Sequence, residues 1–337
     1  MLLQLSITAL IASIMAPPAD PVDTVTVTVI GDVMMHKKQL EYDHAAFLSD
    51  LVPIMSEADL GIANAEFTLA GKPYTGYPCF SAPDSYRQSI LDTGVDVLLT
   101  ANNHILDKGV RGLERTLKQY SLFSGSGLDE TQYLQNNPLI IKKKSLRIAI
   151  VNFTYGTNAA PRAGYPRVSR MEKDEIARQM QVARDSADFI LVLPHWGKEY
   201  ALRHDRTQED WAVWLVEEGA DAIIGAHPHV VQDTAHIKGV PVVYSMGNAV
   251  SNMSARNTQL ELAVTLTIIR NRESGSMELK EPELHFLWCS RPGGKTDTFK
   301  TLVVADWIGK RDEWTSPSDY DNMTLTLERV KKATGIE

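Results

Sequence analysis

The chain has few cysteines and no concentration of positive charge. Only Cys79 and Cys289 are cysteines among 337 residues, and the absence of a Cys-x-x-Cys pair argues against a zinc site built from thiolates. These two thiols could pair in an oxidising compartment, or they could be two small buried apolar residues. The formal net charge is −8 and no long basic run occurs, so we expect no nucleic acid partner.

Long apolar runs are also scarce, and the most prominent one lies at the amino terminus. Residues 2–16 are largely apolar, and small residues and prolines follow them. This run is too short to span a membrane stably and resembles the apolar segment of a signal peptide, although the first basic residue is Lys37. We therefore predict a signal peptide or N-terminal extension over residues 1–21 and export to the periplasm or cell envelope. The alternative is a cytoplasmic protein that begins with an ordinary strand.

The remaining chain alternates between apolar strands and helices. Residues 22–30 are β-branched and alternate in polarity, which indicates a strand with one polar face. Short apolar runs predict further strands at residues 60–63, 95–100, 146–153, 189–193, 222–224 and 240–244. Helical spacing of apolar residues predicts helices at residues 44–57, 84–93, 110–120, 171–186, 207–218 and 322–333. Residues 138–153 resemble one hairpin, and residues 259–270 with 277–288 resemble another. The order is typical of an α/β fold.

Polar side chains follow at least five of these strands directly. The candidates, in chain order, are Asp32, Glu66, Asn103, His104, His195, His227 and His229. Each cluster alone could be a turn or a helix cap, but ligands of α/β sheets bind beyond the carboxyl ends of strands, so we expect these side chains to converge. Carboxylate, amide oxygen and imidazole together suit one or two divalent ions such as Mn²⁺, Fe, Zn²⁺ or Co. Two ions about 3.5–4 Å apart can share a hydroxide of lowered pKa, and a neighbouring histidine can protonate the leaving group.

Six stretches give the chain a specific resemblance to a known family. GDVMM, NAEF, DVLLTANNHILDKGVRGL, LPHWGKEY, GADAIIGAHPHVVQ and YSMGN are similar to segments of the bacterial capsule synthesis protein CapA family, the poly-γ-glutamate synthesis family. That family in turn resembles the calcineurin-like metallophosphoesterases. The similarity covers about residues 25–250. It implies a metallophosphatase-like four-layer α/β/β/α sandwich over residues 22–255, with residues 256–337 completing the same sandwich as a hairpin and a helix.

The resemblance also implies a role for each candidate residue. Asp32 and His229 would hold the first ion, Glu66 would bridge both ions, and His104 would be the general acid. The second ion would be held by one amide and two imidazoles, those of Asn103, His195 and His227.

The chain departs from the phosphoesterase pattern at two positions. Phosphoesterases have a histidine two residues after the first aspartate, whereas this chain has Met34, a thioether that suits hard divalent ions poorly. His36 is a candidate substitute for that histidine, and Glu66 stands where phosphoesterases have an aspartate. Weaker candidates, for substrate binding, are Glu199, Tyr155, Asn158 and Asn248.

Two functions of different classes fit these observations. The first is a metal-dependent hydrolase that acts on a phosphoester or on a γ-glutamyl or cell-wall amide bond. The second is a non-catalytic accessory or binding component of capsule polymer synthesis and export. Met34, in place of the histidine of phosphoesterases, favours this second function. Both imply a polymer or small-molecule substrate of the cell envelope and contact with membrane-associated capsule machinery.

Overall fold

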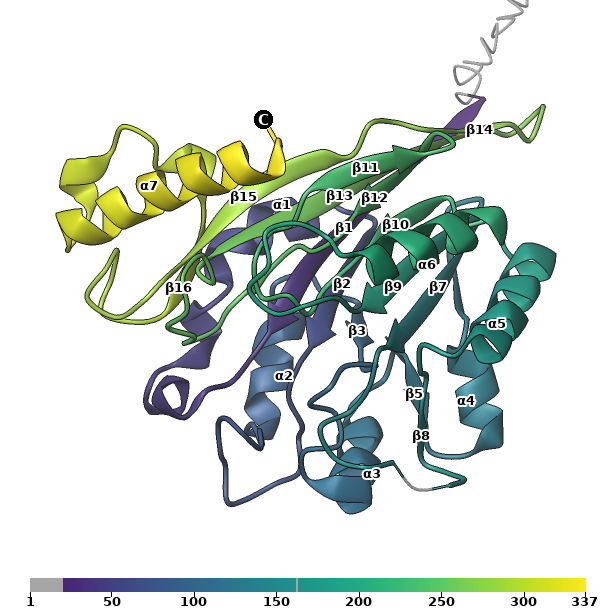
Figure 1. Ribbon diagram of the computed structural model, residues 1–337, viewed down its shortest axis with the longest axis horizontal. Helices are drawn as coiled ribbons and strands as arrows, with labels where there is room; N and C mark the ends of the chain where they lie inside the picture. The colour runs from purple at the N-terminus through teal and green to yellow at the C-terminus, as the bar shows by residue number, and fades with distance from the viewer. Residues whose placement is uncertain (1–20, 162) are drawn as a thin grey trace, which may run out of the picture.

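Two β-sheets pack face to face in the computed structural model, and helices cover their outer faces (Figure 1). The structure describes residues 21–161 and 163–337, so the predicted signal peptide lies outside it except for its last residue. The first sheet contains, in spatial order, β16 (Lys300–Val303), β15 (Glu283–Ser290), β13 (Leu260–Asn271), β1 (Val22–Val33), β2 (Leu60–Ala65), β3 (Val97–Leu99) and β4 (Phe123–Ser124), with β14 (Met277–Leu279) paired to β13. The second contains β11 (Thr234–Ile237), β12 (Val240–Val243), β10 (Ala222–Ile224), β9 (Phe189–His195), β7 (Leu146–Thr154) and β6 (Leu139–Lys143).

The layers arise from the alternation of side chains along buried strands. Ile62 of β2 and Leu191 of β9 point into the core between the sheets, whereas their neighbours Ala63 and Val192 point outward to the helices. The first sheet is covered by α1 (Val52–Ser56), α2 (Asp84–Leu91) and α3 (Gly109–Gln119). The second is covered by α5 (Lys173–Ser186) and α6 (Arg206–Glu217). Because both faces of β2 and β9 are buried, these strands appear in the sequence as continuous apolar runs. The predicted four-layer α/β/β/α arrangement is confirmed.

Strand direction brings the polar segments to one place. The strands β1, β2, β3 and β4 run parallel in the first sheet, and β7, β9, β10 and β12 run parallel in the second. The segments after the two sets of strands meet: Asp32 N donates to Gly247 O at 3.0 Å, and Ala101 N donates to Asn152 Oδ1 at 2.9 Å. The carboxyl ends of both parallel sets therefore face a common region.

The C-terminal part of the chain joins the first sheet. β13 pairs antiparallel with β1 on one side and with β15 on the other. The last helix, α7 (Pro317–Thr334), packs Met323 and Val330 onto the apolar cluster that also fills the space between the sheets, and Figure 1 shows it beside β15. A short helix, α4 (Glu130–Asn136), and a small sheet of β5 (Ser126–Gly127) and β8 (Arg167–Val168) complete the described elements. In the described ranges, no helix combines the length and apolar character needed to cross a membrane.

Two predicted elements are wrong in their continuity. The helix expected at residues 44–57 is instead two 3₁₀ turns, His44–Ala46 and Ser49–Leu51, followed by α1. Asp43 accepts a hydrogen bond from Ala45 N and starts a separate turn, while Pro53 lacks an N–H and fits only the first turn of a helix. The strand expected at residues 277–288 breaks into β14 and β15, because Pro282 cannot donate to the ladder. The hairpin at residues 138–153 is confirmed as β6 and β7. Both cysteines are free.

Candidate metal centre

The predicted site residues occupy strand ends in both sheets and converge on one point. Asp32 ends β1 and His195 ends β9, while the others lie in the segments after β2, β3 and β10. Each residue is at most 4 % exposed, and the structure brings together Asp32, Glu66, Asn103, His104, His195, His227 and His229. Burying so many ionisable groups in one place is costly unless they are paired or hold a ligand.

A bulge at Gly31 turns the Asp32 side chain into this centre. The parallel register of β1 and β2 shifts between Ile30 and Asp32. A Cβ atom at Gly31 would lie 2.1 Å from Gly247 O, so only glycine permits this close approach of two backbones. The Gly31 amide also donates to the buried carboxylate of Glu261 at 2.8 Å.

The Asp32 carboxylate is held ionised by its neighbours. Asn64 Nδ2 donates to Asp32 Oδ1 at 2.6 Å, and His229 Nδ1 lies 3.3 Å from Asp32 Oδ2. Burial alone would raise the pKa of Asp32, but the hydrogen bond and charge of His229 and the hydrogen bond from Asn64 lower it to about 2. Asp32 is therefore a permanent anion in the centre.

Glu66 lies in the middle of the cluster without a hydrogen-bond donor. Both of its carboxylate oxygens are buried and have no partner among the described residues. Oε1 lies 3.9 Å from His104 Nε2 and 3.9 Å from His195 Nε2, and Oε2 lies 3.9 Å from His229 Nδ1. Burial, and then the negative charge of Asp32, raise the pKa of Glu66 well above its usual range. A buried carboxylate in this state is suited to a cation, which would supply the missing partner.

The imidazoles of the second sheet are in the form that metal ions require. Burial lowers the pKa of His195 to about 3, and burial also lowers the pKa of His227 well below its usual range. Both are thus neutral, as ligation demands. His195 Nε2 lies 2.9 Å from Asn103 Oδ1, and His227 Nδ1 is buried with no hydrogen-bond partner among the described residues. Asp32, Glu66 and His229 offer ligand atoms within 4.8 Å of one another.

The segment from Gly225 to His229 is held in an unusual conformation. His227 and His229 have φ values of 101° and 58°, in a region that residues with a Cβ atom rarely adopt. Pro228 between them accepts a hydrogen bond from Tyr200 N at 2.8 Å, which ties this turn to the loop after β9. At Gly225 a Cβ atom would lie 2.2 Å from Tyr244 O, so this turn passes close against the backbone at the end of β12.

His104 is oriented by a carboxylate three residues further along the chain. His104 Nδ1 lies 2.7 Å from Asp107 Oδ2, and the same oxygen accepts a hydrogen bond from Phe80 N at 2.8 Å. The Phe80 ring also packs edge-on against the imidazole, with ring centroids 4.7 Å apart. With Nδ1 engaged by Asp107, Nε2 is the nitrogen that faces Glu66 and can exchange a proton with a substrate.

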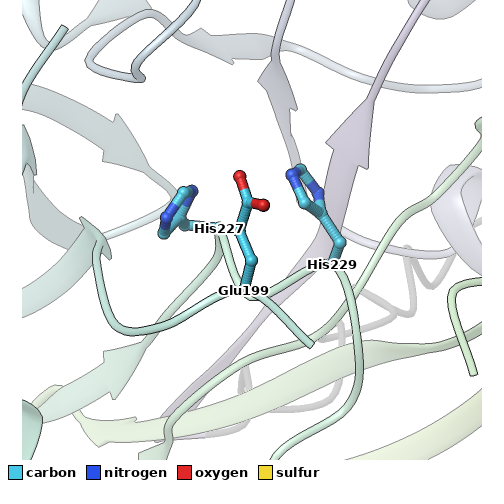
Figure 2. Close-up of side chains that lie close together, drawn as sticks. All are labelled: Glu199, His227 and His229. Atoms are coloured by element: carbon cyan, nitrogen blue, oxygen red, sulfur yellow. The ribbon is translucent and has the colours of Figure 1, made fainter. Parts of the chain in front are cut away.

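The weaker candidates for substrate binding surround the same centre. Tyr155 packs its ring 4.5 Å from that of His227, and Asn158 Nδ2 lies 3.3 Å from His104 Nδ1. Asn248 is buried, and its Oδ1 lies 2.8 Å from His229 Nδ1, so it orients that imidazole. Glu199 is exposed, and Figure 2 shows its carboxylate between the rings of His227 and His229.

A pocket of about 340 Å³ opens over the centre. Its lining residues include His104, His229, Glu199, Tyr200 and Met34. Met34 thus lines the wall at the place where phosphoesterases have a histidine. His36 also lines this pocket, but its Nδ1 lies 3.2 Å from Asn252 N, and the ligand groups found among the described residues do not contain it.

Three residues at the centre were not among the predicted site residues. Asn64 donates to Asp32, Asn102 Nδ2 donates to Ala65 O at 2.9 Å, and Asp107 contacts His104. The sequence does contain a signal for Asn64, because it precedes Glu66 by two residues in an extended segment and so points to the same side. Asp107 is three residues after His104, a separation that one turn can bring together.

Comparisons with known proteins agree with this geometry. The profile of the family described as bacterial capsule synthesis protein PGA_cap matches residues 26–253, more than half of the chain. The chain belongs to this family. It is 28% identical over 258 residues to the capsule biosynthesis protein CapA of Bacillus anthracis, covering 70% of this chain and 62% of that protein. It is 26% identical over 331 residues to the PGA biosynthesis protein CapA of Bacillus subtilis, covering 92% of this chain and 84% of that protein.

A solved structure shares the fold of this PGA_cap family member. It is that of a candidate 5′-nucleotidase from Staphylococcus aureus in complex with α-ketoglutarate, with a TM-score of 0.52 and 13% identity over 78% of this chain. The matched region is 54% of that protein, so the comparison concerns the fold alone. The metallophosphatase-like fold implied by the sequence resemblance is confirmed.

Proposed function

We propose that this PGA_cap family protein is a metal-dependent hydrolase of the cell envelope, acting on a phosphoester or on a γ-glutamyl or cell-wall amide bond. The observation that carries the proposal is Glu66, a fully buried carboxylate with no hydrogen-bond partner among the described residues, which faces Asp32 and three imidazoles. A centre of carboxylates, an amide oxygen and imidazoles suits Mn²⁺, Fe, Zn²⁺ or Co. One or two such ions would be held by Asp32, Glu66, Asn103, His195, His227 and His229.

A bound divalent ion would lower the pKa of water and polarise the scissile carbonyl or phosphoryl group. The residues of the chain supply orientation and a proton. His104 would pass a proton from Nε2 to the leaving group, while its Nδ1–H, held by Asp107, fixes the orientation of the ring. Tyr155 and Asn158, at the rim, would contact the substrate, which enters through the pocket lined by His104 and His229.

The proposal is tested by metal loading and a substrate panel. Purified protein loaded separately with Mn²⁺, Fe, Zn²⁺ or Co should hydrolyse a phosphoester or a γ-glutamyl peptide, and His104→Gln should remove most of this activity while the bound metal remains. Ser49→Ala, a substitution on a 3₁₀ turn outside the centre, serves as the control for handling and folding. Protein that holds no divalent ion in any of these preparations would contradict the proposal.

A second candidate function is a non-catalytic accessory role in capsule polymer synthesis and export. Met34 favours it, because this thioether lies in the pocket wall where a metal ligand would be expected. In the native host, His104→Gln separates the two functions: a normal capsule with this variant supports the accessory role, and a lost capsule supports catalysis. We also propose export and contact with membrane-associated capsule machinery. N-terminal sequencing of the native protein tests export, since an intact Met1 contradicts cleavage.

A further inference from the structure

Glu199 lies outside the buried cluster but is directed at two of its imidazoles. It comes four residues after the end of β9 and is exposed, whereas His227 and His229 are 3 % and 2 % exposed. The three residues offer ligand atoms within 4.8 Å of one another, and Figure 2 shows the carboxylate between the two rings. This spacing fits a single cation placed among them.

The backbone holds Glu199 in this position. Tyr200 has a φ of 64°, and its N–H donates to Pro228 O at 2.8 Å, directly between the two histidines. Gly197, two residues before Glu199, has a φ of 89°, and a Cβ atom there would lie 2.6 Å from the side chain of Gln208. The loop at residues 197–200 is therefore hydrogen-bonded to the turn that carries His227 and His229. This contact fixes the Glu199 carboxylate close to the two imidazoles.

Each of the two imidazoles has a ring nitrogen that is available to bind an ion. His227 Nδ1 is buried and has no hydrogen-bond partner among the described residues. His229 Nδ1 is hydrogen-bonded to Asn248 Oδ1 at 2.8 Å, which fixes the tautomer and leaves Nε2 free to bind an ion. The Glu199 carboxylate lies between these two imidazoles (Figure 2).

Position 34 explains why an additional carboxylate is needed. Met34 and Glu199 line the same pocket, and the thioether of Met34 is a poor ligand for a hard divalent ion. We propose that Glu199 is a metal ligand, acting with His227 and His229 on the side of the pocket where position 34 offers no hard ligand. Since His229 also belongs to the buried group with Asp32 and Glu66, the ion bound by Glu199 lies at the mouth of the centre, next to that group. This inference rests on the proposed metal centre and assigns one further ligand to it.

The test is metal binding, measured without any substrate. Metal-free wild type, Glu199→Gln and Glu209→Gln are titrated with MnCl₂ in a calorimeter, and bound manganese is counted after dialysis. Glu209 is the matched control, because it is a partly exposed carboxylate of α6 whose side chain pairs with Arg206 at 3.2 Å. We expect Glu199→Gln to bind at least one manganese ion with an affinity lower by about tenfold or more. Glu209→Gln should bind manganese with the affinity of the wild type. Thermal unfolding in EDTA should be the same for all three proteins, which shows that the loop change leaves the fold intact.

The outcomes separate this inference from the proposed function. If the wild type binds manganese and Glu199→Gln binds it with the same number and affinity, Glu199 is not a ligand, although the buried centre stands. If Glu209→Gln weakens binding as much as Glu199→Gln, the effect is one of general charge and the inference is overturned. If the wild type binds no manganese, both the metal centre and the role of Glu199 are wrong.

Discussion

The proposed metal centre predicts that the stability of the protein depends on a metal ion through Glu66. In the metal-free protein its carboxylate is fully buried, close to the anionic Asp32, and lacks a hydrogen-bond donor among the described residues. A bound divalent ion would supply the missing partner, whereas Glu66→Gln removes both the buried carboxyl group and a ligand. The variant should therefore be at least as stable as the wild type in EDTA and should gain little from added metal.

The size of the metal effect is set by mass action. At a free ion concentration of about 100 times Kd, binding to the native state adds about 2.7 kcal/mol to the free energy of unfolding. Unfolding entropy is about 2.1 cal/mol/K per residue, so for 337 residues that energy raises Tm by about 4 °C. Thermal unfolding followed by circular dichroism, with EDTA or with MnCl₂, measures this shift. Equal shifts for the wild type and Glu66→Gln would refute the reasoning.

The same carboxylate predicts a pH dependence in the absence of metal. The pKa of Glu66 is raised in the folded protein, so above its ordinary pKa the native state binds more protons than the unfolded state. The free energy of unfolding therefore falls as the pH rises from the ordinary pKa of Glu66 to its raised pKa in the folded protein. The loss is at most about 1.4 kcal/mol per pH unit for this one group. Urea unfolding of the wild type and Glu66→Gln isolates the slope, because other titrating groups are common to both proteins. If the wild type instead gained stability relative to Glu66→Gln as the pH rises, the raised pKa assigned to Glu66 would be contradicted.

Further substitutions test single contacts. Asp107→Asn should lower kcat of the metal-loaded protein by about 10- to 100-fold at unchanged metal content. The substitution replaces a hydrogen bond between a carboxylate and His104 that is worth about 1.5–3 kcal/mol. An unchanged kcat in the substrate assay would show that the orientation of His104 by Asp107 has no part in the mechanism. Gly225→Ala should lower the free energy of unfolding by about 1–3 kcal/mol, because its Cβ would lie 2.2 Å from Tyr244 O and 2.4 Å from Trp196 Nε1. A urea midpoint equal to that of the wild type would show that the turn relaxes freely.

The sequence was sufficient to locate most of the centre. The strands β2, β3, β9 and β10 are buried on both faces and therefore consist of apolar runs. The polar residues that follow each run are therefore easy to recognise in the sequence. Parallel strands carry the residues after their carboxyl ends to the same edge of a sheet. Residues as distant as Asp32 and His229 were therefore expected to meet, and they do.

Other parts of the centre depend on tertiary contacts that no local pattern contains. The left-handed conformations of His227 and His229 accompany the hydrogen bond from Tyr200 N to Pro228 O, which joins two loops far apart in sequence. That bond also holds Glu199 close to His227 and His229, whereas the sequence had suggested substrate binding for this residue. Likewise, the helix expected at residues 44–57 was broken by local effects at Asp43 and Pro53 that the apolar spacing did not reveal.

The central claim is that the buried cluster around Glu66 binds divalent metal. A crystal structure of the metal-loaded protein, with anomalous data collected at the absorption edge of the added ion, tests it most directly. We expect at least one anomalous peak within about 2.0–2.3 Å of the oxygens of Asp32 and Glu66 or the nitrogens of His195, His227 and His229. Absence of any such peak in crystals grown with saturating metal, with Glu66 still lacking a partner, would contradict the claim.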